Sequence, residues 1–577
     1  MRKKLFVLFS VMMVGAMLLS ACGPRAQKAE VATGEDLVTL NINWQTEPPT
    51  LDPSLATDTT SVDVLNNLFV GLTQFDPVTG EVSPALATDW ESGTDDEGNQ
   101  TWTFTMRDDV PWVKYNAETG EVVQEVDEEG EPHFVDASDV VYGFRRTVDP
   151  ETGSDYSYIT YVIKNAQPIN SGDEAFTVED LGVEMVDDFT VRFTLENPAG
   201  YFPAIAGLWI GYPMPQWAIE ANGEEWTEPE NIVTNGPYVL EEWVHGAELN
   251  LVKNPLWINA DDVQIERVEG VMITEASTGF ALYENNELDT AAVPLPEMDR
   301  VKTDPELSEE YFSAPVPCTY YYGFTNNKPP FDDVRVRTAF TQSIDRQSLI
   351  DNVLKGGQTP ATSFAPPGIF GAPEPGEVGL EYDPEAAQAA FQEYLDENGM
   401  TVEDFNAMDV VLMHNTSEGH ARIAAAIQQM WTDTLGVEVR VENQEWAVYL
   451  NTIEKESPLE DMPHVWRLGW CADYPDENNW IHEVFNANAG ANRLRREPTE
   501  FDEITAQAAK VQDPAEREEL YLEAERMLAE DEVAYAPIYH YSTENVTKPW
   551  VDRNFPPLGG IDIYNWTIDM AAKEAAQ

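Results

Sequence analysis

The segment Asp409–Val441 reads DVVLMHNTSEGHARIAAAIQQMWTDTLGVEVRV and decides the class of fold. It opens with a short apolar run, residues 409–413, and closes with an alternating run, residues 437–441. Between them, residues 417–434 repeat apolar side chains at helical spacing. A strand, a helix of more than four turns and another strand in so few residues are typical of a βαβ unit with parallel strands. The segment therefore predicts an α/β fold.

Further elements are predicted on both sides of this unit. Asp383 and Pro384 begin a helix over residues 386–398, and Gly399 ends it. The other predicted helices span residues 61–72, 140–148, 275–288 and 504–528. Alternating patterns predict strands at 38–44, 102–106, 189–195 and 537–541, a hairpin over 238–252, and an exposed hairpin over 114–132. No internal repeat and no long linker divides the chain, so we expect lobes built from interleaved segments.

The N-terminus carries a targeting signal. Arg2, Lys3 and Lys4 precede an apolar run from Leu5 to Leu19, which predicts a secretory signal over residues 1–21. The tetrad LSAC, residues 19–22, resembles the bacterial lipoprotein box, in which the cysteine, here Cys22, receives a lipid. Residues 22–37 then form a lipid-anchored flexible tether. The alternative is an ordinary signal peptide that is cleaved nearby. We expect an extracytoplasmic protein, anchored to the cell membrane on its periplasmic or cell-surface side.

The charge is strongly acidic, with 104 Asp and Glu against 33 Lys and Arg, a net charge of −71. Nucleic-acid binding requires a basic surface, so the composition argues against it. The acidity is compatible with a saline environment or with solubility outside the cell, and the sequence does not choose between them.

Three cysteines occur in the whole chain. With Cys22 lipidated, Cys318 and Cys471 remain in an oxidising compartment, where a disulfide persists. Their separation does not match the ligand spacing of a zinc site. We therefore expect a disulfide that closes a loop of roughly 150 residues, worth on the order of 5 kcal/mol at most.

The stretch Gly469-Trp470-Cys471-Ala472-Asp473-Tyr474 combines a thiol, a carboxylate and two aromatic side chains. Burying a carboxylate between aromatic rings is costly unless a cation or several donors meet it. We expect Asp473 to receive the positive group of a ligand. The alternative is a surface aspartate in a turn.

Motifs of enzymes are missing from the sequence. With 7 histidines and no H-E-x-x-H pattern, zinc catalysis lacks support. Neither a G-x-S-x-G elbow nor a phosphate-binding G-x-x-x-x-G-K-[ST] loop occurs. The sequence does not decide whether two of its acidic residues form the carboxylate pair of a glycoside hydrolase, because acidic residues occur throughout the chain. We expect no enzyme activity, no cofactor and no metal.

Several longer motifs resemble one protein family. They are Thr234–Tyr238 (TNGPY), Cys318–Arg337 (CTYYYGFTNNKPPFDDVRVR), Asn443–Trp446 (NQEW), Gly469–Tyr474 (GWCADY) and Lys548–Trp550 (KPW). In this order they resemble the bacterial periplasmic oligopeptide-binding proteins, within the family 5 solute-binding proteins of ABC importers. The resemblance covers residues 38–550.

The resemblance implies a three-lobed periplasmic-binding-protein fold of class II type, with a hinged two-lobe ligand trap plus an extra domain. Lobe I would combine residues 38–68, 216–317 and 542–577. Lobe II, the extra domain, would span 69–215, and lobe III 318–541. The resemblance also places Cys318 and Cys471 where the family has a disulfide.

The family's site residues are carried over position by position. Asp473 matches the acid that receives the peptide's ammonium group, and Arg467 and His420 match positions that meet its carboxylate. The implied ligand-binding set is completed by Trp470, Cys471, Asn415, Trp446, Tyr156 and Tyr541, with Tyr320 and Tyr321 near the same cleft. For His420 the alternative is a surface histidine, and for the aromatic residues it is core packing.

Two positions depart from the family pattern. Ile453 stands where well-known members have a pocket arginine, and Leu354 stands where a lysine can occur, although Lys355 is adjacent. Both departures leave the preferred peptide length open.

The resemblance implies a monomeric receptor that closes on an oligopeptide and delivers it to a membrane permease. The alternatives are the same fold binding a murein peptide, a sugar or a metal chelate, or a chaperone-like surface lipoprotein.

Overall fold

The βαβ unit predicted from the sequence is present in the computed structural model, which describes residues 28–30 and 37–576. Strand β17 (Val411–Asn415) pairs in parallel with β18 (Arg440–Gln444), and α14 (Glu418–Leu435) connects them. Ser417 caps the helix, and Gly436 ends it in the left-handed conformation. Both strands begin two or three residues later than predicted.

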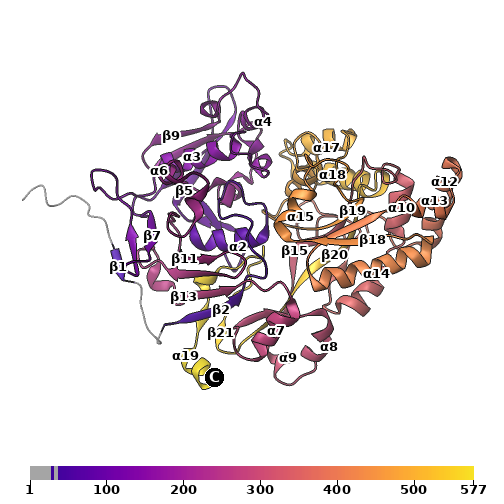
Figure 1. Ribbon diagram of the computed structural model, residues 1–577. Coiled ribbons are helices and arrows are strands. Elements are labelled where there is room, and N and C mark those ends of the chain that lie inside the picture. The colour runs from indigo at the N-terminus through magenta and orange to yellow at the C-terminus, as the bar shows by residue number, and fades with distance from the viewer. Residues whose placement is uncertain (1–27, 31–36, 577) are drawn as a thin grey trace, which may run out of the picture.

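This unit belongs to a seven-stranded sheet in the order β14-β20-β15-β19-β17-β18, with β16 on β20. Its other strands are β14 (Thr290–Ala292), β15 (Tyr311–Phe324), β16 (Thr359–Pro360), β19 (Val465–Cys471) and β20 (Tyr535–Thr547). Tyr320 and Tyr322 of β15 pack into a core with Phe340, Phe391 and Trp431. These partners come from α10 (Val334–Gln342), α12 (Pro384–Asn398) and α14, on the right of Figure 1.

Smaller sheets build the other half of the molecule, on the left of Figure 1. One antiparallel sheet has the order β5 (Ala87–Thr94), β6 (Gln100–Met106), β10 (Thr190–Thr194), β9 (Val183–Asp187). Another has the order β11 (Tyr238–Val244), β12 (Glu248–Lys253), β13 (Arg267–Val271), β2 (Thr39–Asn43), with β13 and β2 parallel. Two-stranded pairs are β3 (Thr73–Phe75) with β4 (Val82–Pro84) and β21 (Val551–Asp552) with β22 (Thr567–Ile568). The strands predicted in these regions are confirmed.

Several predicted helices have different bounds in the structure. The helix expected over 275–288 ends four residues earlier, at Glu284, and the one expected over 140–148 begins three residues earlier, at Ala137. The helix expected over 504–528 is two helices, α17 (Glu500–Ala508) and α18 (Pro514–Arg526), because Asp513 and Pro514 start a new helix. The helix expected over 61–72 is α2 (Thr59–Leu68). The remaining longer helices are α3 (Ala137–Val148), α6 (Gln216–Asn222), α7 (Ala276–Glu284), α15 (Trp446–Thr452) and α19 (Met570–Ala576). Shorter ones are α4 (Ala166–Asn170), α5 (Phe202–Ile205), α8 (Met298–Val301), α9 (Leu307–Glu310), α11 (Arg346–Leu349), α13 (Val402–Asn406) and α16 (Glu483–Phe485).

The predicted hairpin over 114–132 is only partly exposed. It consists of β7 (Val113–Asn116) and β8 (Glu121–Gln124), and Val113 and Val122 are buried against Val239 and Val252. Within the expected tether, β1 (Lys28–Glu30) pairs with β8, so these three residues form a strand and are not a free linker. The expected signal peptide and Cys22 lie outside the described residues.

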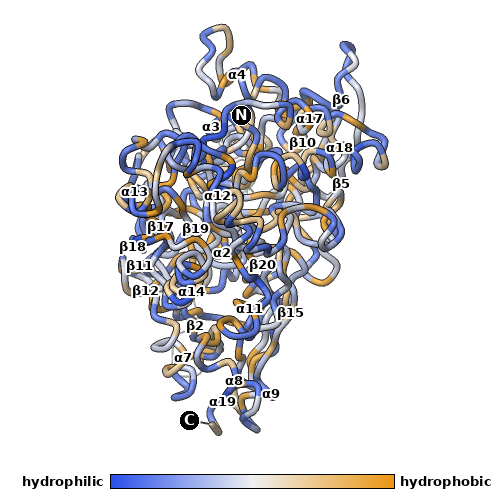
Figure 2. The backbone as a smooth tube through the Cα atoms, turned by 90° about the vertical axis from the view of Figure 1, so that its right-hand side faces the viewer, coloured by the Kyte–Doolittle hydropathy of each residue, from blue (hydrophilic) through white to orange (hydrophobic). Residues whose placement is uncertain are grey.

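A buried carboxylate joins the two ends of the described chain. Asp289 is 1% exposed and accepts hydrogen bonds from Asn41 N, Trp550 Nε1 and Lys573 Nζ, each at 2.7 Å. Removing one partner of a buried carboxylate lowers the free energy of unfolding by several kcal/mol. This network therefore holds β2 against α19. Figure 2 shows α8, α9 and α19 gathered at the narrow end of the molecule.

Strands β15 and β20 run continuously from this narrow end into the large sheet. Their pairing shifts register between Pro315 and Thr319, where two prolines lack the N–H groups that a ladder needs. On the other side of β15, Cys318 lies opposite Cys471 of β19, and the two form a disulfide. The predicted pairing of these cysteines is thus confirmed.

Replacing both cysteines by serine is expected to lower the free energy of unfolding. The disulfide closes a loop with a sequence separation of 153, and loss of this constraint costs about 2–5 kcal/mol. Chemical denaturation measures the difference. As a control, a reducing agent should destabilise the unmodified protein and leave the double variant unchanged. Equal stability of the oxidised and reduced protein would contradict the expectation.

Candidate functional site

A cavity of about 650 Å³ lies between the two halves of the molecule. Residues 466–473, from β19 and the loop after it, line one side. The opposite side is lined by residues of α2 and by the segments 155–158 and 207–212. A cavity of this size between two parts of a molecule is a usual place for a small ligand.

Most of the predicted ligand-binding residues line this cavity. They are Tyr156, Trp446, Arg467, Trp470, Cys471, Asp473 and Tyr541. His420 and Asn415 do not belong to its lining. Asn415 accepts a hydrogen bond from the lining residue Arg467, whereas His420 contacts Tyr320, which does not line the cavity. Tyr321 lines the cavity, whereas Tyr320 lies beneath Arg467.

Asp473 is held by hydrogen bonds from both sides of the cavity. Tyr156 Oη donates to its Oδ2 over 3.0 Å, and Asn479 Nδ2 donates to the same oxygen over 2.8 Å. The side chain of Asn479 also accepts from the Asp473 backbone at 2.9 Å. Burial raises the pKa of Asp473 to about 6, and the two side-chain donors oppose this rise. Both donors use Oδ2, so Oδ1 is left for a further positive donor.

A second carboxyl group lies behind Asp473. Glu483 Oε2 accepts from Asn479 at 2.8 Å, and Glu483 Oε1 accepts from Tyr474 Oη at 2.5 Å. Burial raises the pKa of Glu483 to about 8, against these hydrogen bonds. At neutral pH Glu483 is therefore mostly uncharged, and Asp473 carries the negative charge at this end of the cavity.

Aromatic rings surround the carboxylate. Tyr156 stacks on Trp470 with ring centroids 6.1 Å apart and packs against Tyr158 and Trp209 at 5.0 and 5.3 Å. Burial raises the pKa values of Tyr156 and Tyr158 well above the ordinary value, so both stay neutral donors. Aromatic faces beside a carboxylate favour an ammonium group.

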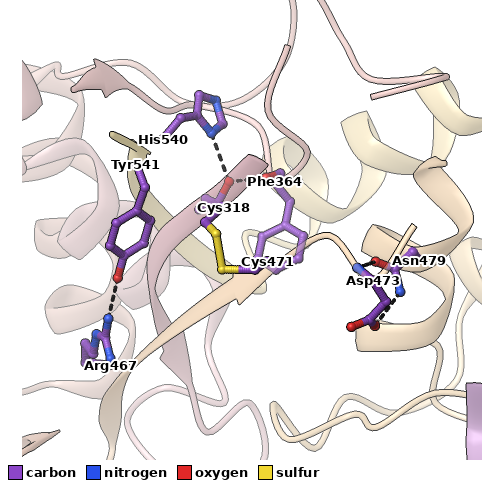
Figure 3. The surroundings of a disulfide bond; sticks show 9 residues. Cys318, Phe364, Arg467, Cys471, Asp473, Asn479, His540 and Tyr541 are labelled. Atoms are coloured by element: carbon purple, nitrogen blue, oxygen red, sulfur yellow. Dashed lines mark hydrogen bonds between the residues drawn. A yellow bond between two sulfur atoms is a disulfide. The ribbon is translucent and has the colours of Figure 1, made fainter. Parts of the chain in front are cut away.

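Arg467 lies on the other side of the disulfide from Asp473, as Figure 3 shows. It is 7% exposed, donates to Asn415 Oδ1 over 3.2 Å and to Tyr541 Oη, and stacks on Tyr320 at 4.6 Å. Its Nε has no acceptor, and no carboxylate of the described chain forms an ion pair with it. A buried guanidinium without an anionic partner is costly, and a ligand carboxylate would meet that need.

His420 lies behind this arginine. Its Nδ1 is 3.4 Å from Tyr320 Oη, and burial together with Arg467 and His414 lowers its pKa well below the ordinary value. The imidazole is thus neutral at neutral pH and does not add positive charge to this end. The contact of His420 with a ligand carboxylate remains a prediction.

Sequence reasoning missed several lining or supporting residues. Tyr158 and Arg493 line the cavity, and Asn479 orients Asp473. Ile453, noted for its departure from the family pattern, is fully buried in the core. Tyr158 is only two residues from Tyr156, so the sequence could have suggested that both lie near the cavity. Nothing in the sequence distinguishes Asn479 or Arg493 from the other asparagines and arginines of the chain.

Within residues 28–30 and 37–576, no group of three His, Cys, Asp or Glu side chains is arranged to hold a metal ion. In the same ranges, no helix has the length and apolar character required to cross a membrane.

Contacts across the cavity hold the two halves together. Besides the Tyr156–Asp473 bond, Trp446 Nε1 donates to Asp58 Oδ1 at 3.2 Å, and Gln512 Nε2 donates to the Pro198 carbonyl at 2.8 Å. Each joins a residue of one half of the molecule to a residue of the other half. The structure is therefore a closed arrangement.

Comparison with known proteins agrees with this geometry. Residues 81–492 match the model of the bacterial extracellular solute-binding proteins, family 5. The periplasmic oligopeptide-binding protein OppA of Escherichia coli is 33% identical over 94% of this chain and 95% of its own length. The crystal structure of Haemophilus influenzae OppA in complex with the peptide RPPGFSPFR has a TM-score of 0.80 and 28% identity, covering 93% of this chain and all of that one.

The murein tripeptide-binding protein MppA provides a comparison of conformations. One structure of Escherichia coli MppA gives a TM-score of 0.81 at 29% identity, covering 94% of this chain and 99% of that one. An unliganded open form of MppA gives 0.60 at 30% identity, covering 92% and 98%. The lower score of the open form accords with the closed contacts described above. From the match over most of its length, the chain belongs to the family 5 bacterial extracellular solute-binding proteins.

Proposed function

We propose that this protein captures oligopeptides in the cavity and delivers them to the membrane permease of an ABC importer. One observation carries the proposal. The cavity has an aspartate with a free carboxylate oxygen at one end and a buried arginine without an anionic partner at the other. A peptide has the matching pair of groups, an ammonium at its N-terminus and a carboxylate at its C-terminus.

The relatives support this proposal. Similar proteins are named for oligopeptide binding, and the Haemophilus influenzae relative was solved as a complex with a peptide. In this chain the ammonium would lie between Asp473 and the rings of Tyr156 and Trp470, and the carboxylate against Arg467. Because both anchors bind groups that every peptide has, we expect selectivity for side chains to be broad. The protein would act by binding, without a catalytic step.

We further propose that β15 and β20 form the hinge of the trap. They are continuous between the narrow end and the large sheet, and their ladder is interrupted near Pro315. The lobe boundaries at residues 317 and 541 fall inside these strands. Asp289, in the segment 216–317, supports the composition of lobe I, because it binds residues of the other two segments. Lobe II over 69–215 and lobe III over 318–541 would close on the peptide.

The remaining parts of the proposal concern the membrane. Lipidation at Cys22 would anchor a monomer at the cell membrane, and the permease would recognise the closed form. The energy for import would come from the transporter, because the sequence has no phosphate-binding loop.

The same fold could hold another solute, such as a murein peptide, a sugar or a metal chelate. Asp473 distinguishes a peptide from a sugar or another ligand without an ammonium group, because such a ligand gains nothing from it.

The first test is the substitution Asp473→Asn. Loss of a charged hydrogen bond of about 1.5–3 kcal/mol should weaken peptide binding roughly 10- to 100-fold in calorimetry. N-acetylated peptides should bind the variant and the unmodified protein equally. Asp461→Asn, which removes an exposed carboxylate elsewhere in the same half, serves as the matched control. Unchanged affinity in the Asp473 variant would refute the ammonium anchor.

The same variant is expected to change the pH dependence of stability without ligand. The pKa of Asp473 is raised from 3.8 to about 6, so its favourable contribution is complete below about pH 4 and is lost as the pH rises through 6. The asparagine variant should therefore gain stability relative to the unmodified protein between pH 4 and 7, by about 1–3 kcal/mol. Denaturant unfolding across this range measures the difference, and a difference independent of pH would contradict the raised pKa.

Membrane attachment is tested by Cys22→Ser. The unmodified protein should appear in the membrane fraction, and mass spectrometry should find a lipid on Cys22 at the mature N-terminus. The variant should be released from the membrane but still bind peptide. Membrane attachment that survives the substitution would exclude Cys22 as the anchor.

A further inference from the structure

A second cavity, of about 280 Å³, lies beside the large one. Its walls come from β2, β14, β15 and β20 and from the C-terminal segment that includes residues 553–561. The two cavities share the lining residues Gln45, Val316, Thr543, Pro556, Pro557, Gly559 and Gly560. At Gly559 this common wall has open space beside it, because an added Cβ would meet nothing within 4 Å. A ligand in the large cavity can therefore extend a group into the second one.

The lining of the second cavity has a positive charge and no negative one. Among the described residues that form it, none is an aspartate or glutamate, and Arg553 is the one cation. This lining contrasts with the net charge of −71 of the whole chain and with the six aspartates that line the large cavity. A cavity with a cation and no acid attracts a negatively charged group.

Local structure fixes the position of this cation. The pairing of β21 with β22 places Arg553 beside Trp566, just beyond the paired residues. The guanidinium stacks on the ring of Trp566 at 4.3 Å and on that of Phe555 at 4.4 Å. Phe555 in turn stacks on Phe312 of β15, with ring centroids 3.6 Å apart. The charge is thus held in place before any ligand arrives.

Two N–H donors of this cavity have no acceptor. The Nε of Arg553 is buried and makes no hydrogen bond to the described chain. The Nε1 of Trp566, a residue that is 2% exposed and lines the same cavity, makes none either. Buried donors without acceptors are uncommon in folded proteins. Their presence at one cavity indicates an acceptor that a ligand supplies.

Asp63 is the acid whose charge acts on Arg553, and it does not neutralise the guanidinium. No ion pair within 4.0 Å joins the two in the described chain. Burial lowers the pKa of Arg553 to about 10, against the charge of Asp63, so the guanidinium stays charged at neutral pH. Burial, Asp562 and Asp58 raise the pKa of Asp63 to about 7, so its carboxyl group is only partly ionised there. Arg553 is therefore able to bind a further anion.

A carboxylate matches these donors. A guanidinium binds a carboxylate through its N–H groups, and stacking on aromatic rings does not compete with that contact. A peptide has such a group at its C-terminus and on each aspartate or glutamate side chain. The common wall of the two cavities brings these groups within reach of Arg553.

We propose that the cavity beside Arg553 is a subsite that binds a carboxylate of the captured peptide, either its C-terminus or an acidic side chain. This inference rests on the proposed function. It adds a second cationic anchor to Arg467, in a separate cavity and on a different segment of the chain.

The test uses alanine-based peptides of equal length that carry glutamate or glutamine at one position at a time, with a free or an amidated C-terminus. If an acidic side chain occupies the subsite, calorimetry should show about tenfold tighter binding of glutamate than of glutamine at one position, the value of a charged hydrogen bond. This preference should disappear in Arg553→Gln. If the C-terminus occupies the subsite, glutamate gives no gain, and the loss of affinity on amidation should disappear in Arg553→Gln instead.

Three controls accompany this variant. The peptide that lacks the carboxylate in question should bind Arg553→Gln and the unmodified protein equally, which also reports that the variant is folded. Arg553→Lys keeps the charge without the planar fork and should keep part of the effect. Arg422→Gln removes one positive charge from an exposed position of α14 outside both cavity linings, and it should keep the full effect.

The possible failures are distinguishable. If peptides bind but neither carboxylate improves their affinity for the unmodified protein, the subsite is refuted while peptide capture stands. The same conclusion follows if Arg553→Gln leaves the preference for glutamate and the effect of amidation unchanged. If none of the peptides binds the unmodified protein, peptide capture itself fails, and the subsite fails with it.

Discussion

The backbone ladder that β15 makes with β19 on one side and β20 on the other is the constraint on which the site depends. β15 pairs with β19 from Cys318 to Phe324, which places Arg467 and Cys471 at defined positions along the cavity. Its pairing with β20 positions Tyr541, which accepts a hydrogen bond from Arg467. The disulfide then fixes the end of β19, just before Asp473. Both proposed anchors are thus held by one set of hydrogen bonds.

The cavity keeps groups that are unfavourable without a ligand. Arg467 is buried without a carboxylate partner, and burial raises the pKa of Asp473. Both features lower the stability of the closed form, because charged groups that are removed from water need partners. A ligand with complementary charges would remove the cost, so closure and binding would be coupled. The large hydrophobic core and the Asp289 hydrogen bonds stabilise the fold and offset the cost of these buried groups.

Local patterns predicted most elements because they are encoded by neighbouring residues. Asp383, Pro384 and Gly399 delimit α12 where expected, and the βαβ unit is parallel as expected. The errors have local causes as well. Pro514 divides one predicted helix into two. Residues 28–30 form a strand only because they pair with β8. The site residues were found mainly through the family resemblance, and the cavity lining includes seven of the nine.

The sequence by itself determined the α/β class, the acidic charge and the pairing of Cys318 with Cys471, and it predicted Asp473 as a ligand-binding residue. These depend on spacing, composition and motifs within short stretches. Only the tertiary structure decided that Tyr156 reaches Asp473 across the cavity, that Asn479 orients it, and that Asp63 and Asp562 lie together. The physical reason is that such contacts join residues hundreds of positions apart. Their distances follow from how the sheets pack and how the two halves close, and no local pattern encodes that.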